Sequence, residues 1–296
     1  MAIPGSELSQ VLSQVVESTG KSVVRIQGRR RPFSGIAWSA TEVVTVHHAL
    51  QHVEGEVVVG VEGAEYQARI KGSDPSTDIA LLEIDGALSP ATFDDGAGLK
   101  VGNLVLRLGR PGQSVRATSG IIGTQGKTPW RTHRGGEVDR YLESDAAHQP
   151  GFSGGALAGL DGKVLGMTTT GLLRGTSLTL PSLTLKRVVA QLQQYGRVRQ
   201  SYLGLSMQPL VLADDVKQIT GEEVGLVVIA IEKGGPADLA GLTYGDIVLH
   251  LGDATVKTVE DLFAFLRGDH VGQAVPVKFF RQGKVATVQV TLGARP

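Results

Sequence analysis

The chain of 296 residues contains no cysteine, and aromatic side chains make up only 5% of it. Without cysteine, neither a disulfide framework nor a thiolate metal site is possible, and the chain fits a reducing compartment without requiring one. A net charge is also lacking, because 29 Lys and Arg residues balance 29 Asp and Glu residues. We therefore expect no nucleic-acid-binding surface. The one dense basic cluster, Arg29–Arg31, is interpreted as a solvated loop.

Long apolar runs are missing as well. No segment approaches the ~20 apolar residues that span a bilayer, so no membrane span is predicted. The N-terminal segment MAIPGSELSQVLSQVV lacks the basic start and long apolar run of a signal peptide. The sequence as written therefore predicts a cytoplasmic protein. A chain trimmed of a targeting segment would instead be periplasmic or extracytoplasmic.

Glycine is abundant, with 40 residues, and short β-branched segments alternate with turn residues. This pattern predicts a mainly β protein and favours a barrel or sandwich over alternating strand and helix units. Asp161-Gly162 and Gln282-Gly283 are predicted to form tight hairpin turns. The predicted strands are SVVRIQG, EVVTVHHAL, EVVVGVEG, EYQARIKGS, IALLEIDG, NLVLRLGR, KVLGMTTT, GLVVIAI, DIVLHLG, AVPVKFF and KVATVQVTL.

A few helices are predicted among these strands. Apolar residues recur at helical spacing over residues 8–16 and again over residues 182–195. A third helix is predicted to begin at Thr258, whose hydroxyl can cap it, with Asp261 in its first turn. The polar segment RVRQS follows the second helix and places a boundary near Val198. We therefore predict two domains, 1–198 and 199–296.

Ser153 lies between four glycines and a proline, in QPGFSGGAL. Glycines of this kind serve either a plain turn or an exposed hydroxyl surrounded by free backbone N–H groups. Two other segments favour the second interpretation. His48 ends the β-branched run of TVHHAL, and Asp78 opens the strand of TDIALLEID. The order His, Asp, Ser along the chain belongs to the chymotrypsin-like arrangement of serine hydrolases.

Each of these residue types has a role in acyl transfer. A serine hydroxyl attacks a carbonyl only if a base, here His48, takes its proton. Asp78 would hold the other imidazole N–H and stabilise the imidazolium. The backbone N–H groups of Gly151 and Ser153 would bind the oxyanion. His47 precedes His48, and because neighbouring side chains on a strand point to opposite faces, only one of the two is expected in the site.

Three motifs in this order resemble the HtrA (DegP-like) family of serine proteases with a PDZ domain. TVHHAL resembles the family's histidine motif, DPSTDIALLEID its aspartate segment and SDAAHQPGFSGGAL its serine loop. The resemblance implies a chymotrypsin-like double β-barrel followed by a PDZ domain. It also implies an endopeptidase that cleaves unfolded or damaged proteins through an acyl-enzyme on Ser153, without metal or organic cofactor. Related proteins form trimers, so the resemblance implies a homo-oligomer.

The resemblance also implies a substrate-binding region beside the nucleophile. Extended substrates would pair with the backbone near Thr169–Gly171, and side-chain specificity would involve His148, Gly171 and Ser177. The predicted substrate-binding residues are His148, Thr169, Thr170, Gly171 and Ser177. Phe152 departs from the family pattern, which usually has asparagine there. Its ring is expected either to narrow the site or to alter preference on the leaving-group side.

The second domain resembles a PDZ module through YLGL and GGPADLAGLTYGDIVLHLGD. The backbone of YLGL, Tyr202–Leu205, would receive a peptide's C-terminal carboxylate, and the peptide would extend the sheet edge beside the helix after Thr258. The predicted peptide-binding residues are Tyr202, Leu203, Gly204, Leu205, Leu262 and Phe265. For Leu262 and Phe265, an ordinary place in the core is an equal alternative.

A rival function from another class is a non-catalytic, chaperone-like protein that binds peptides and retains the protease fold. Proteins of this kind that have lost activity normally lack a member of the triad. The histidine, the aspartate and the serine are all present in this sequence, which favours the enzyme.

Overall fold

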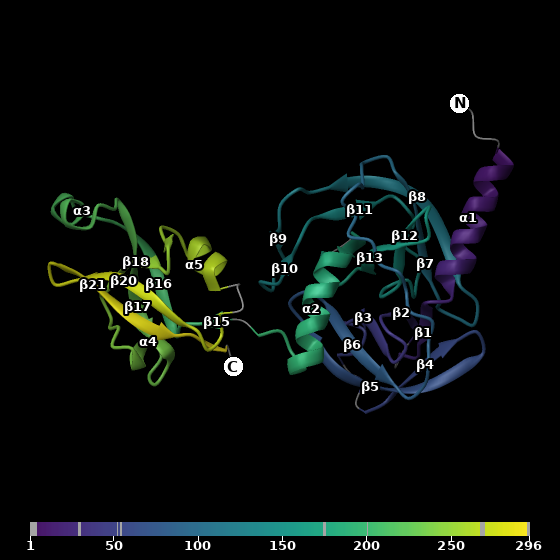
Figure 1. Cartoon of the computed structure of the whole chain (residues 1–296), viewed down its shortest axis with the longest axis horizontal. Helices are drawn as coiled ribbons and strands as arrows, with labels where there is room; N and C mark the ends of the chain where they lie inside the picture. The colour runs from purple at the N-terminus through teal and green to yellow at the C-terminus, as the bar shows by residue number, and fades with distance from the viewer. Residues whose placement is uncertain are drawn as a thin grey trace. The chain divides into compact units, whose positions relative to one another are not determined.

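The computed structural model describes residues 5–28, 31–51, 53, 55–173, 176–199, 201–266 and 270–294. The chain divides into two compact units, Met1–Val198 and Arg199–Pro296 (Figure 1). Arg31 of the basic cluster is exposed, whereas Arg29 and Arg30 lie outside the described residues.

A closed barrel of six antiparallel strands forms the first half of the first unit. Its strands are β1 (Val23–Ile26), β2 (Phe33–Ala37), β3 (Glu42–Val46), β4 (Val57–Val61), β5 (Ala64–Asp74) and β6 (Ile79–Ile84). They run in the order β1-β2-β3-β6-β5-β4, and β1 pairs with β4 to close the barrel. β2 and β3 are buried along their whole length, and β3 is rich in the β-branched side chains that favour strands.

A second closed barrel of six strands follows in the same unit. Its strands are β7 (Leu104–Gly109), β8 (Arg116–Gln125), β11 (Leu142–Ser144), β12 (Ala156–Gly159), β13 (Val164–Thr169) and β14 (Leu178–Pro181). They run in the order β11-β14-β13-β12-β7-β8, and β11 pairs with β8. The short strands β9 (Trp130–Arg131) and β10 (Glu137–Val138) pair with each other outside the barrel. The prediction of a mainly β protein with two barrels is confirmed.

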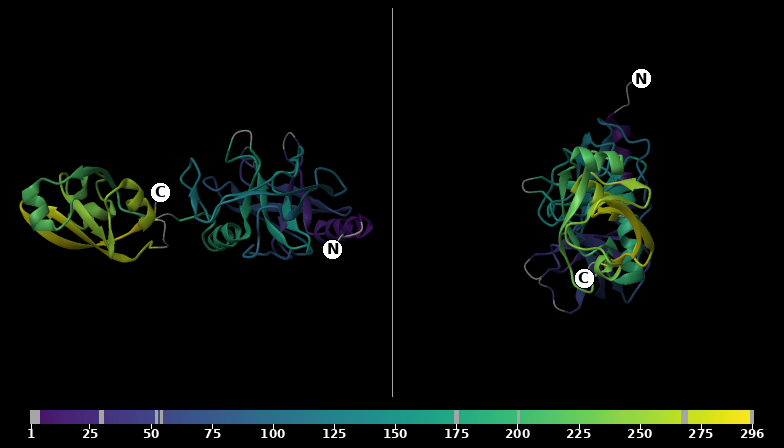
Figure 2. Two further views of the ribbon diagram at one scale, coloured as in Figure 1. Left: turned by 90° about the horizontal axis from the view of Figure 1, so that it is seen from above. Right: turned by 90° about the vertical axis from the view of Figure 1, so that its left-hand side faces the viewer.

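Two helices lie on the outside of the first unit (Figures 1 and 2). α1 (Gly5–Gly20) contacts β7, and α2 (Ser182–Tyr195) contacts β5 and β6 of one barrel and β13 and β14 of the other. α2 ends at Gly196, which adopts a left-handed conformation with φ of 70° and caps the helix. α2 therefore packs against both barrels and links them.

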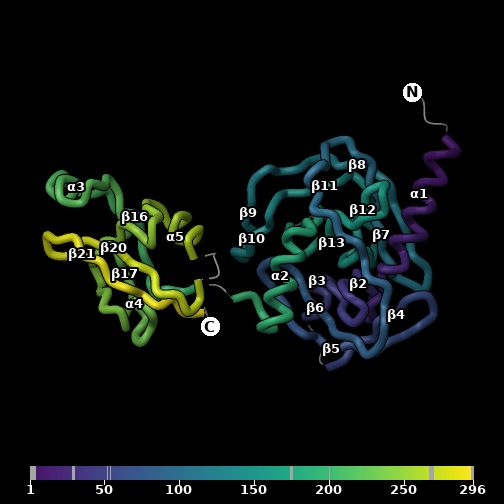
Figure 3. The backbone as a smooth tube through the Cα atoms, in the orientation of Figure 1, coloured from purple at the N-terminus to yellow at the C-terminus, as the bar shows by residue number. Residues whose placement is uncertain are grey.

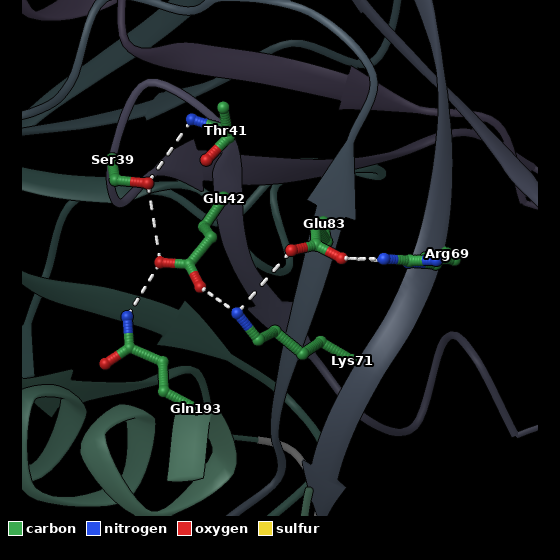
Figure 4. A network of polar contacts seen from close by, with 7 residues as sticks. All are labelled: Ser39, Thr41, Glu42, Arg69, Lys71, Glu83 and Gln193. Atoms are coloured by element: carbon green, nitrogen blue, oxygen red, sulfur yellow. Dashed lines mark hydrogen bonds and ion pairs between the residues drawn. The ribbon is translucent and has the colours of Figure 1, made fainter.

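A network of polar contacts fixes the last turns of α2 to the first barrel (Figure 4). The buried carboxylate of Glu42 accepts hydrogen bonds from Lys71 at 2.8 Å and from Gln193 of α2 at 2.7 Å. Lys71 also lies 3.6 Å from Glu83, whose other oxygen binds Arg69. Lys71, on β5, thus bridges two carboxylates, and the Glu42 carboxylate has a partner on each side.

The second unit is strand-rich, and its described residues form three short helices. Its elements are β15 (Ser201–Tyr202), β16 (Leu205–Val211), α3 (Asp214–Thr220), β17 (Val224–Ile231), α4 (Pro236–Leu239), β18 (Ile247–Leu251), β19 (Ala254–Thr255), α5 (Val259–Leu266), β20 (Ala274–Arg281), β21 (Lys284–Thr291) and β22 (Gly293–Ala294). The main sheet has the order β16-β17-β18-β20-β21, with β19 paired to β18 and β15 to β22. Figure 3 traces β20 and β21 as one long hairpin.

Local sequence signals are confirmed at several turns. Gln282 and Gly283 join β20 to β21 with φ of 48° and 80°, as a tight hairpin of mirror-image turn type requires. The Thr258 hydroxyl accepts the N–H of Asp261 at 3.1 Å, and the Asp261 carboxylate accepts the N–H of Thr258 at 2.8 Å. This reciprocal pair is a capping box at the start of α5. Asp161-Gly162 lies in the hairpin between β12 and β13.

Other strands differ from the sequence prediction. EVVTVHHAL forms a strand only to Val46, so both histidines lie in the turn that follows β3. The argument from alternating strand faces therefore does not apply to them. Strands β2, β8 and β16 were not predicted, because glycine or polar residues interrupt their apolar pattern. Within the described residues, no helix is long and apolar enough to cross a membrane.

Candidate active site

The loop around Ser153 is held by glycines that allow close backbone contact. Gly151 and Gly154 both have φ of 84°, a conformation that favours glycine. A Cβ on Gly154 would lie 2.0 Å from the carbonyl oxygen of Ser34, on β2 of the first barrel. The Ser34 N–H donates to the Ser153 carbonyl at 3.0 Å, and its hydroxyl donates to the Gly151 carbonyl at 2.7 Å. The loop of the second barrel is thus bound directly to the first barrel.

Phe152 lies fully inside the protein, with an exposed fraction of 0%. Its ring packs against Gly109, where an added Cβ would lie 2.6 Å from the ring, and meets the His148 ring edge-on at 6.2 Å between centroids. The side chain therefore does not project into the leaving-group side, contrary to one expectation from the sequence. It fills the core beneath the serine instead.

His48 and Asp78 form a close pair. The His48 ring atom Nδ1 lies 2.8 Å from Asp78 Oδ2, and the His48 backbone N–H donates to Asp78 Oδ1 at 2.8 Å. The Thr169 hydroxyl donates to Asp78 Oδ2 as well. Asp78 is only 3% exposed and has a φ of 61°, which turns its side chain back towards the histidine before β6 begins. The ionised Asp78 carboxylate can only accept hydrogen bonds. His48 Nδ1 is therefore the ring nitrogen that carries a proton and donates to it.

The neighbouring histidine has a different environment. The backbone N–H of His47 donates to the Asp78 carbonyl at 3.1 Å, and no side-chain hydrogen bond joins the two residues in the described part of the chain. Burial lowers the pKa of His47, while the nearby Asp78 charge acts in the opposite direction. The hydrogen bond to the carboxylate therefore distinguishes His48 from His47.

The hydroxyl of Ser153 points towards the second barrel. Its Oγ lies 3.3 Å from Thr170 Oγ1 and 3.5 Å from His148 Nε2, and the residue is 8% exposed. No hydrogen bond between Ser153 and His48 occurs among the described side chains. Neither the N–H of Gly151 nor that of Ser153 donates to another described group.

His148 is held by a residue of the predicted substrate-binding region. Ser177 Oγ lies 3.0 Å from His148 Nδ1, and Arg107 donates to Ser177 Oγ at 2.5 Å. Burial, the Arg107 charge and His48 together lower the pKa of His148 to about 4, so the ring is neutral at physiological pH. Arg107 could not be identified from the sequence, because a charged residue inside a strand pattern normally faces water.

Gly171 lies against the histidine–aspartate pair. A Cβ at this position would lie 2.5 Å from Asp78 Oδ2 and 2.6 Å from His48 Nδ1. The Gly171 N–H donates to the Thr169 hydroxyl at 2.9 Å. Thr169 is buried, whereas Thr170 and Gly171 are exposed at the end of β13. All five predicted substrate-binding residues thus contact the proposed triad or one another.

The second unit brings its predicted groove residues to the edge of its sheet. β16 is the terminal strand of the sheet order, and α5 contacts it. Leu203 and Leu262 are buried in the core, while Leu205 and Phe265 pack against it partly exposed. Gly204, with φ of 74°, turns the chain before β16, and its carbonyl accepts the Glu232 N–H at 2.9 Å. Tyr202 lies on β15, and its backbone pairs with that of Gly293 on β22. For Leu262, the core alternative describes its contacts.

Two cavities lie away from Ser153. One of about 240 Å³ is lined by residues of the second unit around Tyr244, and one of about 40 Å³ is lined around Glu62. No group of three or more potential metal ligands occurs among the described residues.

Each unit of the chain matches a known protein family. Residues 33–167 match the family described as "Trypsin-like peptidase domain", and residues 201–292 match "PDZ domain". The "Probable periplasmic serine endoprotease DegP-like" of Brucella suis biovar 1 (strain 1330) is 31% identical over 290 residues, which are 94% of this chain and 56% of the relative. The protein of the same name from Rhizobium meliloti (strain 1021) is 32% identical over 92% of this chain and 56% of the relative.

Solved structures show the same likeness over nearly the whole chain. The serine endoprotease from Yersinia pestis superposes with a TM-score of 0.75 at 26% identity, covering 96% of this chain and 98% of that one. The HtrA-type protease AlgW with a tripeptide superposes with a TM-score of 0.73 at 25% identity, covering 96% and 97%. The chain spans little more than half the length of the sequence relatives that it matches.

Proposed function

This chain belongs to the HtrA/DegP-like proteins, in which a trypsin-like peptidase domain precedes a PDZ domain, and on that premise we propose that it is a serine endopeptidase. The observation that carries the proposal is the short contact between His48 and Asp78 beside the loop of Ser153. A neutral imidazole whose Nδ1–H is held by a carboxylate offers its Nε2 lone pair as a base.

The proposed reaction begins with a rotation of the serine. In the resting structure the Ser153 hydroxyl contacts Thr170 and His148, so its side chain must turn towards His48 when a substrate binds. His48 Nε2 then takes the hydroxyl proton as Oγ attacks the peptide carbonyl. The resulting imidazolium is stabilised by Asp78 and later gives its proton to the leaving amine. Water hydrolyses the acyl-enzyme by the same route.

The oxyanion is assigned to the backbone N–H groups of Gly151 and Ser153. Both are without an acceptor in the described structure, so each can donate to a substrate oxygen. The bonds from Ser34 hold the carbonyls of these same two residues and thereby restrict the loop. Such preorganisation is what makes a donor effective in the transition state, where losing one typically costs about 3 kcal/mol of barrier.

The substrates proposed are unfolded or damaged proteins, bound in extended form along Thr169–Gly171. The PDZ domain is proposed to bind peptide C-termini at the edge of β16, beside α5, where a peptide can add a strand. Following its likeness to proteins named periplasmic, we also propose a periplasmic location. The homotrimer is proposed from the family resemblance of the sequence alone.

A comparison of wild type with Ser153→Ala tests the proposal. Purified proteins are assayed on casein, and folding is checked by thermal unfolding. Loss of a triad member typically costs about 10⁴-fold or more in rate, so the variant should be inactive with an unchanged melting temperature. Equal low activity in both proteins would favour the non-catalytic, peptide-binding alternative.

A further inference from the structure

Arg107 is a buried cation whose described hydrogen-bond partners are uncharged. The side chain points from β7 into the second barrel and has an exposed fraction of 0%. Its hydrogen-bond acceptors are hydroxyls, Ser177 at 2.5 Å and Ser144 at 3.2 Å, and its Nε has no partner. No carboxylate among the described residues forms an ion pair with it. Glu143 is near enough to raise its pKa, but that carboxylate accepts the Tyr141 hydroxyl.

A buried charge without a partner of opposite sign destabilises the fold. Burial lowers the pKa of Arg107 to about 10, which still leaves it charged at neutral pH. Buried charges in proteins are normally paired, because an unpaired ion loses its hydration without compensation. A positive potential of this kind favours any anion that enters the site beside it.

The hydrogen bonds connect this charge to the nucleophile. Arg107 donates to Ser177 Oγ, which leaves the Ser177 proton for His148 Nδ1, its other described partner at 3.0 Å. Nδ1 is then an acceptor, so the neutral ring carries its proton on Nε2. That N–H faces Ser153 Oγ at 3.5 Å, the outer limit of a hydrogen bond. His148 therefore presents a weakly satisfied donor beside the nucleophile.

The geometry points to a substrate specificity for an acidic side chain, Asp or Glu, at the residue before the scissile bond. This inference rests on the proposed peptidase function and adds a substrate class to it. His148 Nε2–H donates to the substrate carboxylate. Arg107 is a positioning residue, which fixes the His148 tautomer through Ser177 and contributes its positive charge. A small apolar side chain would neither accept a hydrogen bond from His148 nor compensate the charge of Arg107.

The test measures kcat/KM for blocked peptides that differ only at the residue before the scissile bond, which is Glu, Asp, Gln, Val or Ala. Because both termini are blocked, a side-chain carboxylate is the only anion by which the peptides differ at that site. Wild type is expected to prefer Glu or Asp over Gln by about tenfold or more, as charge-assisted hydrogen bonds exceed neutral ones. Faster cleavage of the Val or Ala peptide would overturn the inference and leave the proposed function standing.

The matched variants are Arg107→Met and Arg140→Met. Arg140 lies in the same half of the chain but donates to the backbone carbonyls of Asp95 and Gly96, away from Ser153. Arg107→Met is expected to remove the preference for acid over Gln, and Arg140→Met to keep it. Retention of the preference in Arg107→Met would overturn the role of that residue.

Ser177→Ala gives a second route if Arg107→Met does not fold. It breaks the connection between Arg107 and His148 and is expected to lower kcat/KM for the Glu peptide by a larger factor than kcat/KM for the Ala peptide. The ratio of kcat/KM for the Glu peptide to kcat/KM for the Ala peptide distinguishes a lost preference from a folding defect, since a purely structural defect lowers both values together. If wild type cleaves neither casein nor any peptide, the proposed function fails and the inference falls with it.

Discussion

Replacement of Asp78 by asparagine is the sharpest perturbation of the proposed mechanism. The two carboxylate oxygens receive three donors, which are the backbone N–H of His48, its Nδ1–H and the Thr169 hydroxyl. An asparagine of the same shape carries an NH₂ group on one side. If this group lies at Oδ1, it meets the His48 N–H; if it lies at Oδ2, it meets Nδ1–H and the threonine.

The magnitude follows from the tautomer. With the NH₂ group at the Oδ2 position, His48 must accept on Nδ1 and carry its proton on Nε2, which removes the base. A change of this kind typically lowers kcat by about 10⁴-fold, or about 5 kcal/mol of barrier. Peptide hydrolysis by wild type and Asp78→Asn is measured at neutral pH, with thermal unfolding as the check on folding.

Asp74→Asn is the matched control. Asp74 is equally buried and lies four residues earlier, but its oxygens bind Ser76 and Thr77, not a histidine. We expect this variant to lose stability while kcat falls by less than about tenfold. A folded Asp78→Asn protein with nearly wild-type kcat would refute the assignment of Asp78 as the residue that orients the base.

Two further predictions concern other contacts. Gly171→Ala should lower kcat by about 100-fold, since the new Cβ would displace the His48 ring or the Asp78 carboxylate, and a small misplacement has effects of this size; wild-type activity would contradict the close packing. The hydrogen bond to Glu42 raises the Lys71 pKa above its ordinary 10.5, so the pair stabilises the fold below that pH and loses its effect as pH rises through the folded-state value. Wild type should therefore melt above Lys71→Met at about pH 9, and this gap should narrow as the pH rises beyond 10.5, whereas a constant gap would refute the linkage.

Sequence signals predicted features whose causes are local. The Gln282-Gly283 hairpin and the Thr258 capping box depend on backbone angles and side chains within a few residues. The order of His48, Asp78 and Ser153 could also be recognised in the sequence, because the proposed chemistry requires those residue types. Such features need no knowledge of the distant chain.

Features set by distant partners could not be predicted. Strand β8 carries glycine and exposed residues, and only its pairing with β7 and β11 makes it a strand. Arg107 is polar by every sequence rule, yet the barrel closes over it. The burial of Phe152 depends on the missing side chain of Gly109, 43 residues away by sequence numbers. In each case tertiary packing overrides the local preference.

The central claim is that Ser153 is a nucleophile activated by His48. Labelling of the folded protein with a serine-directed fluorophosphonate, followed by mass-spectrometric mapping, tests it most directly. We predict a single adduct on Ser153 in wild type, and no adduct in a folded His48→Ala variant. An unmodified Ser153 in wild type, or equal labelling of Ser153 without His48, would contradict the account.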